Sequence, residues 1–159
     1  MSDELKRDIL EYMVTHNTMT LATCQGGSPW AATVFFASDG FRLYFFSAPD
    51  SRHSQNLAAN PQVAVTIQED YHDWREIKGI QLEGKVAAVD SLLEKGKAMV
   101  AYTRKYPEII KIFTSPSSGA LYQAFLKVKF YCVMPERIFY IDNKQGLGKR
   151  REIIVKDEG

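Results

Sequence analysis

The hydrophobic positions of this chain fall mostly into short runs of β-branched and aromatic residues. Residues 43–46 (Leu-Tyr-Phe-Phe) and 63–67 (Val-Ala-Val-Thr-Ile) are two such runs, and the turn residues that flank them mark them as buried strands. The same pattern predicts further strands at 19–24, 30–37, 77–90, 126–134, 137–141 and 152–155. The short turns between runs favour an antiparallel barrel of six or seven strands over a parallel α/β sheet.

Glycine and proline residues indicate where this sheet turns or bends. Ser38-Asp39-Gly40 predicts a tight hairpin turn, and Pro135-Glu136 predicts the turn of a closing hairpin. Within the long run 77–90, Gly79 and Gly84 predict bulges or close approaches. Such positions let a long strand bend around a small barrel.

Helical spacing is limited to a few segments. A first helix, ending near residue 17, has one apolar face formed by Leu5, Ile9 and Met13. Ser91 and Glu94 form a capping box for a helix that extends to about residue 105. We expect the inward face of that helix to consist of Leu92, Leu93, Ala98 and Met99. A shorter helix is expected at 107–113, followed by a loop at 114–119.

A polar corner, residues 47–54, separates the two buried runs and has Ser51-Arg52-His53 at its centre. Residues 54–59 have room for a short helix, which Asn60-Pro61 ends. A hydroxyl, a guanidinium, an imidazole and the free N–H groups of a helix start suit an anion such as a phosphate. The same residues also fit a solvated turn with an incidental arginine.

The corner resembles the flavin-phosphate segment of the pyridoxamine 5′-phosphate oxidase-like split-barrel family. Ser-Arg-His, followed by Asn-Leu-(x)3-Pro-x-Val, stands where that family usually has Ser-Arg-Lys or Ser-x-Lys. His53 thus replaces a lysine, and an unperturbed histidine is mostly neutral at pH 7. Segments 77–84, 101–107 and 142–149 are similar to the YhbP-like branch of the same superfamily.

The resemblance implies one FMN-binding split-barrel domain over residues 1–159, mainly β with flanking helices, that forms a homodimer. It assigns the phosphate to Ser51, Arg52 and His53. It places the isoalloxazine ring along the second and third strands, beside Ala32, Thr33, Val34, Phe46 and Ser47. The opposite wall comes from the other subunit, with the candidates Trp74, Lys78, Gln81 and Lys149. Lys78 also fits a solvated strand lysine, and Trp74 a core aromatic.

The resemblance favours an FMN-dependent oxidoreductase that acts on an unknown small molecule, with a nicotinamide as one candidate electron donor. No side chain is recognisable as a dedicated acid, base or nucleophile, which agrees with chemistry carried by a cofactor. The run Trp30-Ala31-Ala32-Thr33 replaces an arginine-containing run of the family and argues against pyridoxamine-phosphate oxidation. A non-enzymatic flavin- or haem-binding sensor or carrier is the alternative, and an empty barrel that serves as an interaction surface is a third interpretation.

Composition narrows these functions further. The chain has 159 residues, of which 45% are hydrophobic and 25% charged, and its formal net charge of +1 argues against bulk attraction to nucleic acid or membranes. No apolar run approaches about 18 residues, and the first residues are acidic, so we expect a cytoplasmic protein. Cys24 and Cys132 lie in apolar runs and are expected to be buried thiols.

Several known site types lack their motifs in this sequence: the GxxxxGK[ST] and GxGxxG nucleotide loops, the HExxH zinc motif and the GxSxG hydrolase elbow. A dimer is expected for a separate reason. Four aromatic residues cannot all face one small core, so some should form a contact surface: Tyr44, Phe46, Phe35 and Tyr140.

Overall fold

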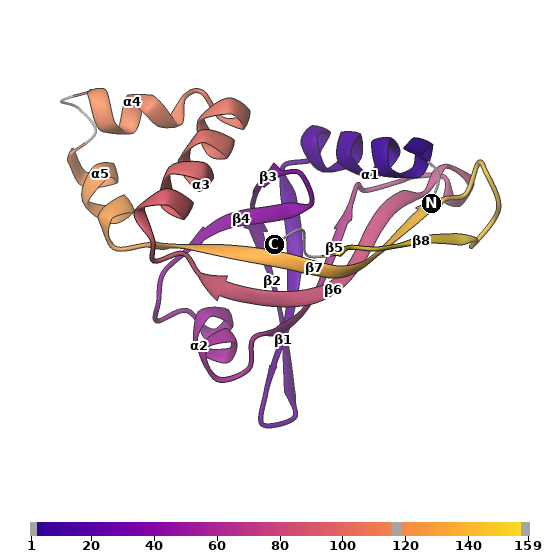
Figure 1. Ribbon diagram of the computed structural model, residues 1–159, viewed down its shortest axis with the longest axis horizontal. Helices are drawn as coiled ribbons and strands as arrows, with labels where there is room; N and C mark the ends of the chain where they lie inside the picture. Colours follow the sequence, from indigo (N-terminus) through magenta and orange to yellow (C-terminus); the bar gives the residue numbers. More distant parts are fainter. Residues whose placement is uncertain (1–2, 116–118, 157–159) are drawn as a thin grey trace.

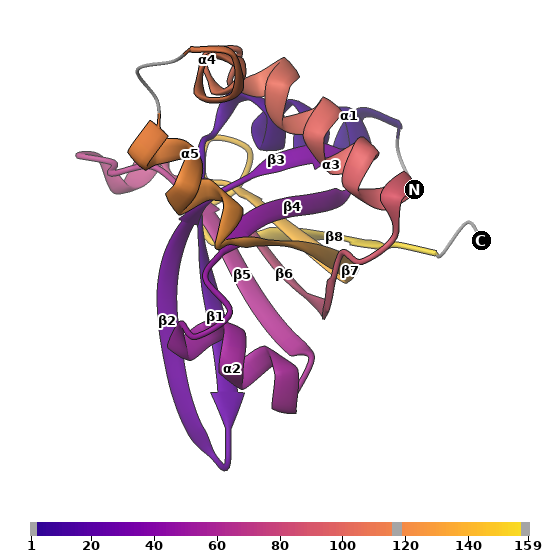
Figure 2. The same ribbon diagram turned by 90° about the vertical axis from the view of Figure 1, so that its left-hand side faces the viewer.

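The computed structural model describes residues 3–115 and 119–156, which form an antiparallel sheet flanked by helices (Figures 1 and 2). The strand order is β2-β1-β5-β6-β7-β4-β3, with β8 paired to β7, and the sheet curls into a half-barrel. The strands are β1 (Thr18–Gln25), β2 (Ser28–Phe35), β3 (Ala37–Asp39), β4 (Arg42–Ser47), β5 (Gln62–Gln68), β6 (Lys78–Ala88), β7 (Lys129–Asp142) and β8 (Arg150–Ile154). The helices are α1 (Asp3–Thr15), α2 (Arg52–Ala59), η1 (Trp74–Glu76), α3 (Leu92–Lys105), α4 (Ile109–Thr114) and α5 (Gly119–Leu126).

The predicted antiparallel split barrel with flanking helices is confirmed, although the sheet has eight strands and not six or seven. The strand expected at 30–37 is divided because the chain turns at Phe36, whose N–H donates to the Asn17 carbonyl (3.1 Å). β3 and β4 form the expected hairpin, with Gly40 at a φ of 57°, in the left-handed region that glycine tolerates.

Strand β4 lies between two hydrophobic clusters, which explains its unbroken apolar sequence. Successive side chains of a strand point to opposite faces. Leu43 and Phe45 therefore enter the barrel core, whereas Tyr44 packs in a second cluster with Ala98 and Tyr102 of α3. Ser47 continues the inward face of β4 and reaches the end of the barrel beside α2.

The prediction of a closing hairpin turned at Pro135-Glu136 was wrong, because a single strand, β7, continues through both residues. Its register with β6 shifts between Glu83 and Gly84, and Gly84 pairs with Pro135 at this bulge. A Cβ at Gly84 would lie 2.2 Å from the Met134 carbonyl oxygen, so only glycine fits this approach. Proline is tolerated at a bulge, where a ladder hydrogen bond is already missing.

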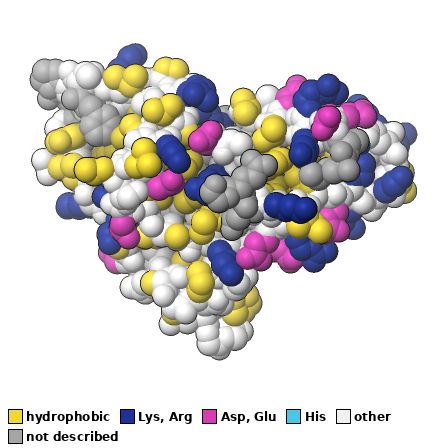
Figure 3. Space-filling view, viewed as in Figure 1, with side chains coloured by type: hydrophobic (Ala, Val, Ile, Leu, Met, Phe, Trp, Pro, Cys, Tyr) yellow, Lys and Arg dark blue, Asp and Glu magenta, His cyan; other side chains and the backbone are white. Residues whose placement is uncertain are grey.

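Helices cover two sides of the sheet. α1 directs its predicted apolar face, Leu5, Ile9 and Met13, into the barrel core. Ser91 caps α3 as predicted, but Leu92 (87% exposed) and Leu93 face solvent, and the buried face consists of Ala98, Ala101 and Tyr102. α5 was not predicted. The loop expected at 114–119 is only partly visible, since residues 116–118 lie outside the described residues. Hydrophobic side chains are numerous on the face of this helical region in Figure 3.

The aromatic residues expected on the exterior are mostly covered within one chain. Tyr44 and Tyr140 are buried, Phe46 is half-buried, and only Phe35 of the four is largely exposed (62%). The dimer was expected because these four aromatic residues could not all be covered within one chain. Since three of them are covered, most of that argument no longer holds. Cys132 is buried as expected, whereas Cys24 is half-buried. Among residues 3–115 and 119–156, no helix combines the length and the apolar composition needed to cross a bilayer.

Candidate functional site

The polar corner folds as a capped helix start. α2 begins at Arg52, two residues before the predicted start at Ser54, because Ser51 is its N-cap. The Ser51 backbone is extended, and its Oγ accepts a hydrogen bond from the Ser54 N–H (3.3 Å). Arg52 and His53 therefore lie in the first turn of a helix, where backbone N–H groups point outward and favour an anion.

Three hydroxyls and one imidazole converge at this corner. Ser47 Oγ lies 2.5 Å from His53 Nε2 and 3.1 Å from Ser51 Oγ, and Ser51 Oγ lies 3.2 Å from the same imidazole nitrogen. Ser51 also donates to Ser54 Oγ (2.8 Å). Two elements, the end of β4 and the start of α2, thus hold one compact set of polar groups.

His53 is half-buried in this set, and burial lowers its pKa below the usual value for histidine. Burial thus favours the neutral form of the imidazole in the free protein. Within the described ranges no carboxylate forms an ion pair with His53. A bound anion would reverse the effect of burial, because a nearby negative charge favours the charged imidazole.

Arg52 lies at the outer edge of the corner, against the β1–β2 hairpin. Its Cζ is 4.2 Å from the centroid of the Trp30 ring, and its Nη2 donates to Ser28 Oγ (3.2 Å). Figure 2 shows α2 beside this hairpin. Sequence reasoning did not connect Ser28 and Trp30 with Arg52, since no local pattern reports a contact between β2 and α2.

The predicted ring-binding residues do not all lie on one surface. On β2, Ala32 and Val34 are half-buried and Thr33 is exposed, with its hydroxyl 3.3 Å from that of Thr20. Ser47 belongs to the corner. Phe46 points to the opposite face of β4 and contacts an aromatic group formed by Tyr102, Phe125 and Phe130.

Three of the remaining four candidates, Trp74, Lys78 and Lys149, lie around the turn between β7 and β8. This turn is at the right of Figure 1, whereas α2 is at the lower left. Gln81 lies farther along β6, opposite Thr66 of β5, and lines a surface hollow of about 350 Å³ with Thr20 of β1. Asp142 pairs with Lys78 (3.6 Å), the Gln81 side chain accepts from Arg150 (3.1 Å), and Asn143 donates to the Trp74 carbonyl (2.7 Å). Lys149 lines a small hollow of about 250 Å³ with Asp142, Gln145 and Arg151.

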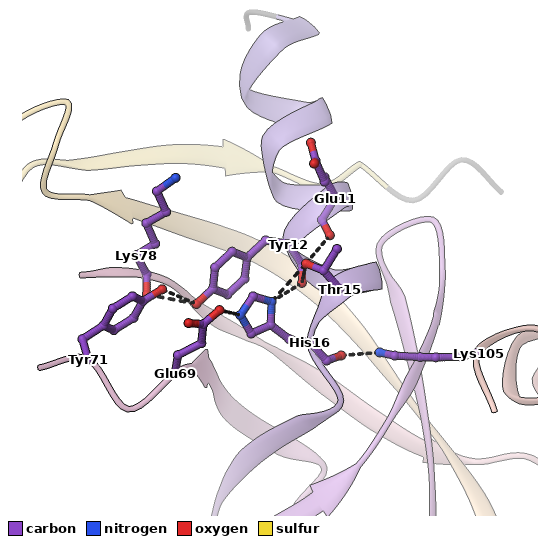
Figure 4. A network of polar contacts seen from close by, with 8 residues as sticks. All are labelled: Glu11, Tyr12, Thr15, His16, Glu69, Tyr71, Lys78 and Lys105. Atoms are coloured by element: carbon purple, nitrogen blue, oxygen red, sulfur yellow. Dashed lines mark hydrogen bonds and ion pairs between the residues drawn. The ribbon is translucent and has the colours of Figure 1, made fainter. Parts of the chain in front are cut away.

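A second polar cluster lies beneath the end of α1, in a hollow of about 300 Å³ (Figure 4). The His16 ring stacks on Tyr12 (3.6 Å between centroids), and its Nε2 contacts Glu69 (2.7 Å). Tyr12 Oη donates to the Lys78 carbonyl (3.0 Å) and lies 3.3 Å from Tyr71 Oη. The Lys105 ammonium donates to the His16 carbonyl. The sequence had not predicted this cluster.

Comparison with known proteins assigns the chain to a family. The family model for pyridoxamine 5′-phosphate oxidase matches residues 4–142, which include nearly the whole barrel. The chain belongs to the pyridoxamine 5′-phosphate oxidase family. The resemblance inferred from the corner and from the three later segments is therefore confirmed.

Relatives in this family confirm the YhbP-like branch. A UPF0306 protein of Photorhabdus laumondii is 34% identical over 109 residues, which cover 67% of this chain and 75% of that protein. The UPF0306 protein YhbP of Salmonella arizonae is 24% identical over 144 residues, covering 89% of this chain and 88% of the relative. Among solved structures, HutZ, the heme storage protein from Vibrio cholerae, superposes with a TM-score of 0.65 over 94% of each chain. Its sequence identity of 17% shows a shared fold alone.

The described side chains do not form a metal-binding site. In the part of the chain that the structure describes, no group of three or more His, Cys, Asp and Glu side chains could hold a metal ion. The chemical features that stand out are the positive charge of Arg52, the hydroxyls around His53 and the start of α2.

Proposed function

We propose that the protein binds FMN and that the corner at the start of α2 holds the phosphate of the cofactor. The observation that carries this proposal is the start of α2: Arg52 is its first residue, and the next residue, His53, contacts the hydroxyls of Ser47 and Ser51, in a family that commonly binds flavin. Within the described residues Arg52 forms no ion pair, so its charge is available to an anion.

The chemistry of the donor set fits a phosphate monoester. A guanidinium can bind two phosphate oxygens through parallel N–H groups, and the first turn of α2 adds backbone donors. The hydroxyls of Ser47 and Ser51 can each reorient toward an incoming oxygen. His53 supplies one ring N–H when neutral and a charge when the phosphate raises its pKa.

We assign the flavin ring to the β2 side of the corner, where small side chains leave room for a flat group. Ala32, Thr33 and Val34 remain the candidates on this strand. Phe46 faces away from this side of β4, so we propose that it supports the site indirectly, by packing β4 against α3. FMN, when bound, supplies hydride or single-electron transfer, and the side chains of this protein bind, orient and shield it.

The proposed site needs two subunits. The β7–β8 turn, around which Trp74, Lys78 and Lys149 lie, is at the right of Figure 1 and α2 is at the lower left, so we propose that these three residues contribute to the site from a partner. Gln81 lies in the same cross-strand row as Thr33. We therefore propose a two-fold dimer in which each corner faces the β7–β8 turn region of the other subunit. Sedimentation equilibrium tests this assembly, and a monomer that binds flavin tightly at micromolar concentration would contradict it.

We propose an oxidoreductase reaction on an unknown small molecule. Pyridoxamine phosphate remains a poor candidate substrate, because the run Trp30-Ala31-Ala32-Thr33 replaces the arginine-containing run that the resemblance leads us to expect. A haem-binding carrier is the second candidate function, and the heme storage protein HutZ, which shares the fold, favours it.

The absorbance spectrum of the purified protein distinguishes these functions. Flavin gives bands at about 370 and 450 nm, whereas haem gives one intense Soret band, and both are properties of the cofactors themselves. We expect the flavin bands and the mass of FMN in the released ligand. A Soret band, or failure to bind added FMN, would contradict the proposal.

A further inference from the structure

The contact between Arg52 and Trp30 joins the start of α2 to strand β2. The guanidinium carbon lies 4.2 Å from the centroid of the indole ring, within the range of a cation–π interaction. Trp30 is 40% exposed and Arg52 is exposed, so both groups border solvent. An exposed arginine side chain without such a contact samples many rotamers.

The contact with the indole ring is not a hydrogen bond, so it takes up no donor at the N–H edge of the guanidinium. Arginine carries five N–H donors in the plane of the group, and a phosphate is recognised by donors at that edge. One donor bonds to Ser28 Oγ (3.2 Å). The indole thus orients the group without using its remaining donors, and a π face does not neutralise its charge.

The chain contains a second arginine–tryptophan pair that shows the contrast. Arg75 lies 5.9 Å from the centroid of the Trp74 ring, but Asp73 holds its edge through bonds of 2.7, 2.9 and 3.0 Å. The N–H donors at one edge of the Arg75 guanidinium are therefore already bound to a carboxylate of the same loop. Within residues 3–115 and 119–156, Arg52 has no such carboxylate.

Hydrogen bonds between buried or half-buried side chains hold α2 against the β1–β2 hairpin, on either side of the contact between Arg52 and Trp30. Asn56 of α2 donates to Thr23 Oγ1 (3.0 Å), and both residues are buried. Thr23 is the cross-strand partner of Trp30 in the β1–β2 register. Asn60, at the end of α2, donates to the Cys24 carbonyl (3.0 Å). The helix that carries Arg52 and the strand that carries Trp30 are thus held in one relative position.

We infer that Trp30 is a positioning residue for phosphate recognition: its indole holds the Arg52 guanidinium with the N–H edge directed at the phosphate of a phosphorylated ligand. This inference rests on the proposed FMN site. It predicts that Trp30 contributes to the discrimination between FMN and riboflavin, which lacks the phosphate, and not to the affinity for the flavin ring.

A double-mutant cycle with flavin titrations tests the inference. Trp30→Leu should weaken FMN binding about three- to tenfold, because a solvent-exposed cation–π contact and the ordering of one long side chain are worth about that much. Riboflavin affinity should stay within about twofold of the wild-type value. Trp30→Phe keeps an aromatic face and should lose less. In an Arg52→Ala background, Trp30→Leu should have no further effect on FMN affinity.

The outcomes separate this inference from the proposed function. If the wild type binds FMN and riboflavin equally, the phosphate site and the inference are both wrong. If Arg52→Ala weakens FMN binding but Trp30→Leu does not, only the inference is wrong. Equal weakening of FMN and riboflavin by Trp30→Leu would overturn it too, because the indole would then act on the flavin ring or on the fold. Thermal unfolding of each variant identifies the last of these causes.

Discussion

Two regions of this molecule each place a histidine among hydroxyl groups, but they differ in how their charges are paired. Beneath α1, His16 contacts the Glu69 carboxylate (2.7 Å) and the Tyr12 carbonyl (2.8 Å), and Lys105 donates to the His16 carbonyl (Figure 4). Lys105 also donates to the Met13 carbonyl. At the start of α2, the polar contacts of His53 within the described residues are all with serine hydroxyls, and its ring lies near that of Phe45. Within the same residues, Arg52 contacts a serine hydroxyl and the π face of Trp30.

On this difference we base the proposal that the region beneath α1 is structural and that the start of α2 binds a ligand. The groups beneath α1 satisfy one another, so a ligand there would have to replace bonds that already exist. The groups at the start of α2 retain a charge and several donors, so an anion would gain contacts without breaking an ion pair. Charge-assisted hydrogen bonds contribute more than neutral ones, so Arg52, which forms no ion pair with any residue that the structure describes, is the strongest candidate contact.

The largest expected effect is on FMN binding by Arg52→Ala. The loss of one charge-assisted contact, worth about 1.5–3 kcal/mol, should weaken FMN binding roughly 10- to 100-fold, with thermal stability unchanged. Riboflavin should bind the variant and the wild type about equally. Arg75→Ala is the matched control, since it removes an exposed arginine that Asp73 already neutralises. Equal FMN affinities of the two variants would show that the corner is an ordinary turn.

The next effect concerns the region beneath α1 and should appear in stability alone. Burial raises the pKa of Tyr12, so its phenol stays a neutral donor, and Tyr12→Phe leaves the Lys78 carbonyl without this partner. We expect the free energy of unfolding to fall by about 0.5–1.5 kcal/mol. Urea denaturation measures this change, and flavin titration provides the control. A large loss of FMN affinity in Tyr12→Phe would contradict the division between the two regions.

The smallest effect is the pH dependence that His53 contributes. Burial lowers its pKa in the free protein, so the unfolded chain binds this proton more readily, and stability falls as pH drops below about 6.5. Phosphate binding favours the charged imidazole, so FMN affinity should gain from a fall in pH between about 7.5 and 5.5. In His53→Lys, the charge is permanent across this window. FMN affinity should be at least as high at pH 7.5 and less sensitive to pH.

The contribution of His53 to the pH dependence is measured by the ratio of the FMN affinity of the wild type to that of His53→Lys. The phosphate of FMN also titrates near pH 6, and its contribution is common to both proteins, so it cancels in the ratio. We expect that ratio to rise as pH falls. A ratio that is constant from pH 5.5 to 7.5 would show that His53 does not sense the bound phosphate.

Local sequence patterns predicted most of the barrel and the position of the corner. The runs at 43–46 and 63–67 became β4 and β5, and Ser51 became the cap of α2, because burial pattern and capping chemistry are properties of neighbouring residues. The path of β7 was missed because Pro135 is accommodated by Gly84 of another strand. The exposure of Leu92 was missed because helical spacing does not tell which face the sheet will cover.

The candidate site was predictable only in part, for the same reason. Ser51, Arg52 and His53 are adjacent in sequence, and their chemistry could be recognised together. The contact of Arg52 with Trp30 depends on how α2 packs against the β1–β2 hairpin, through Asn56 and Thr23. The cluster of Tyr12, His16 and Glu69 likewise joins α1 to the segment after β5. Such contacts follow from the tertiary fold and leave no local signal.

The most direct measurement of the proposed phosphate site is the titration of the wild-type protein with FMN and with riboflavin, followed by flavin fluorescence at one pH. The two ligands share the isoalloxazine ring and differ in the phosphate. If Arg52 and the start of α2 hold that phosphate, FMN should bind at least about tenfold more tightly than riboflavin. Equal affinities would contradict the assignment, since the corner would then contribute nothing to binding.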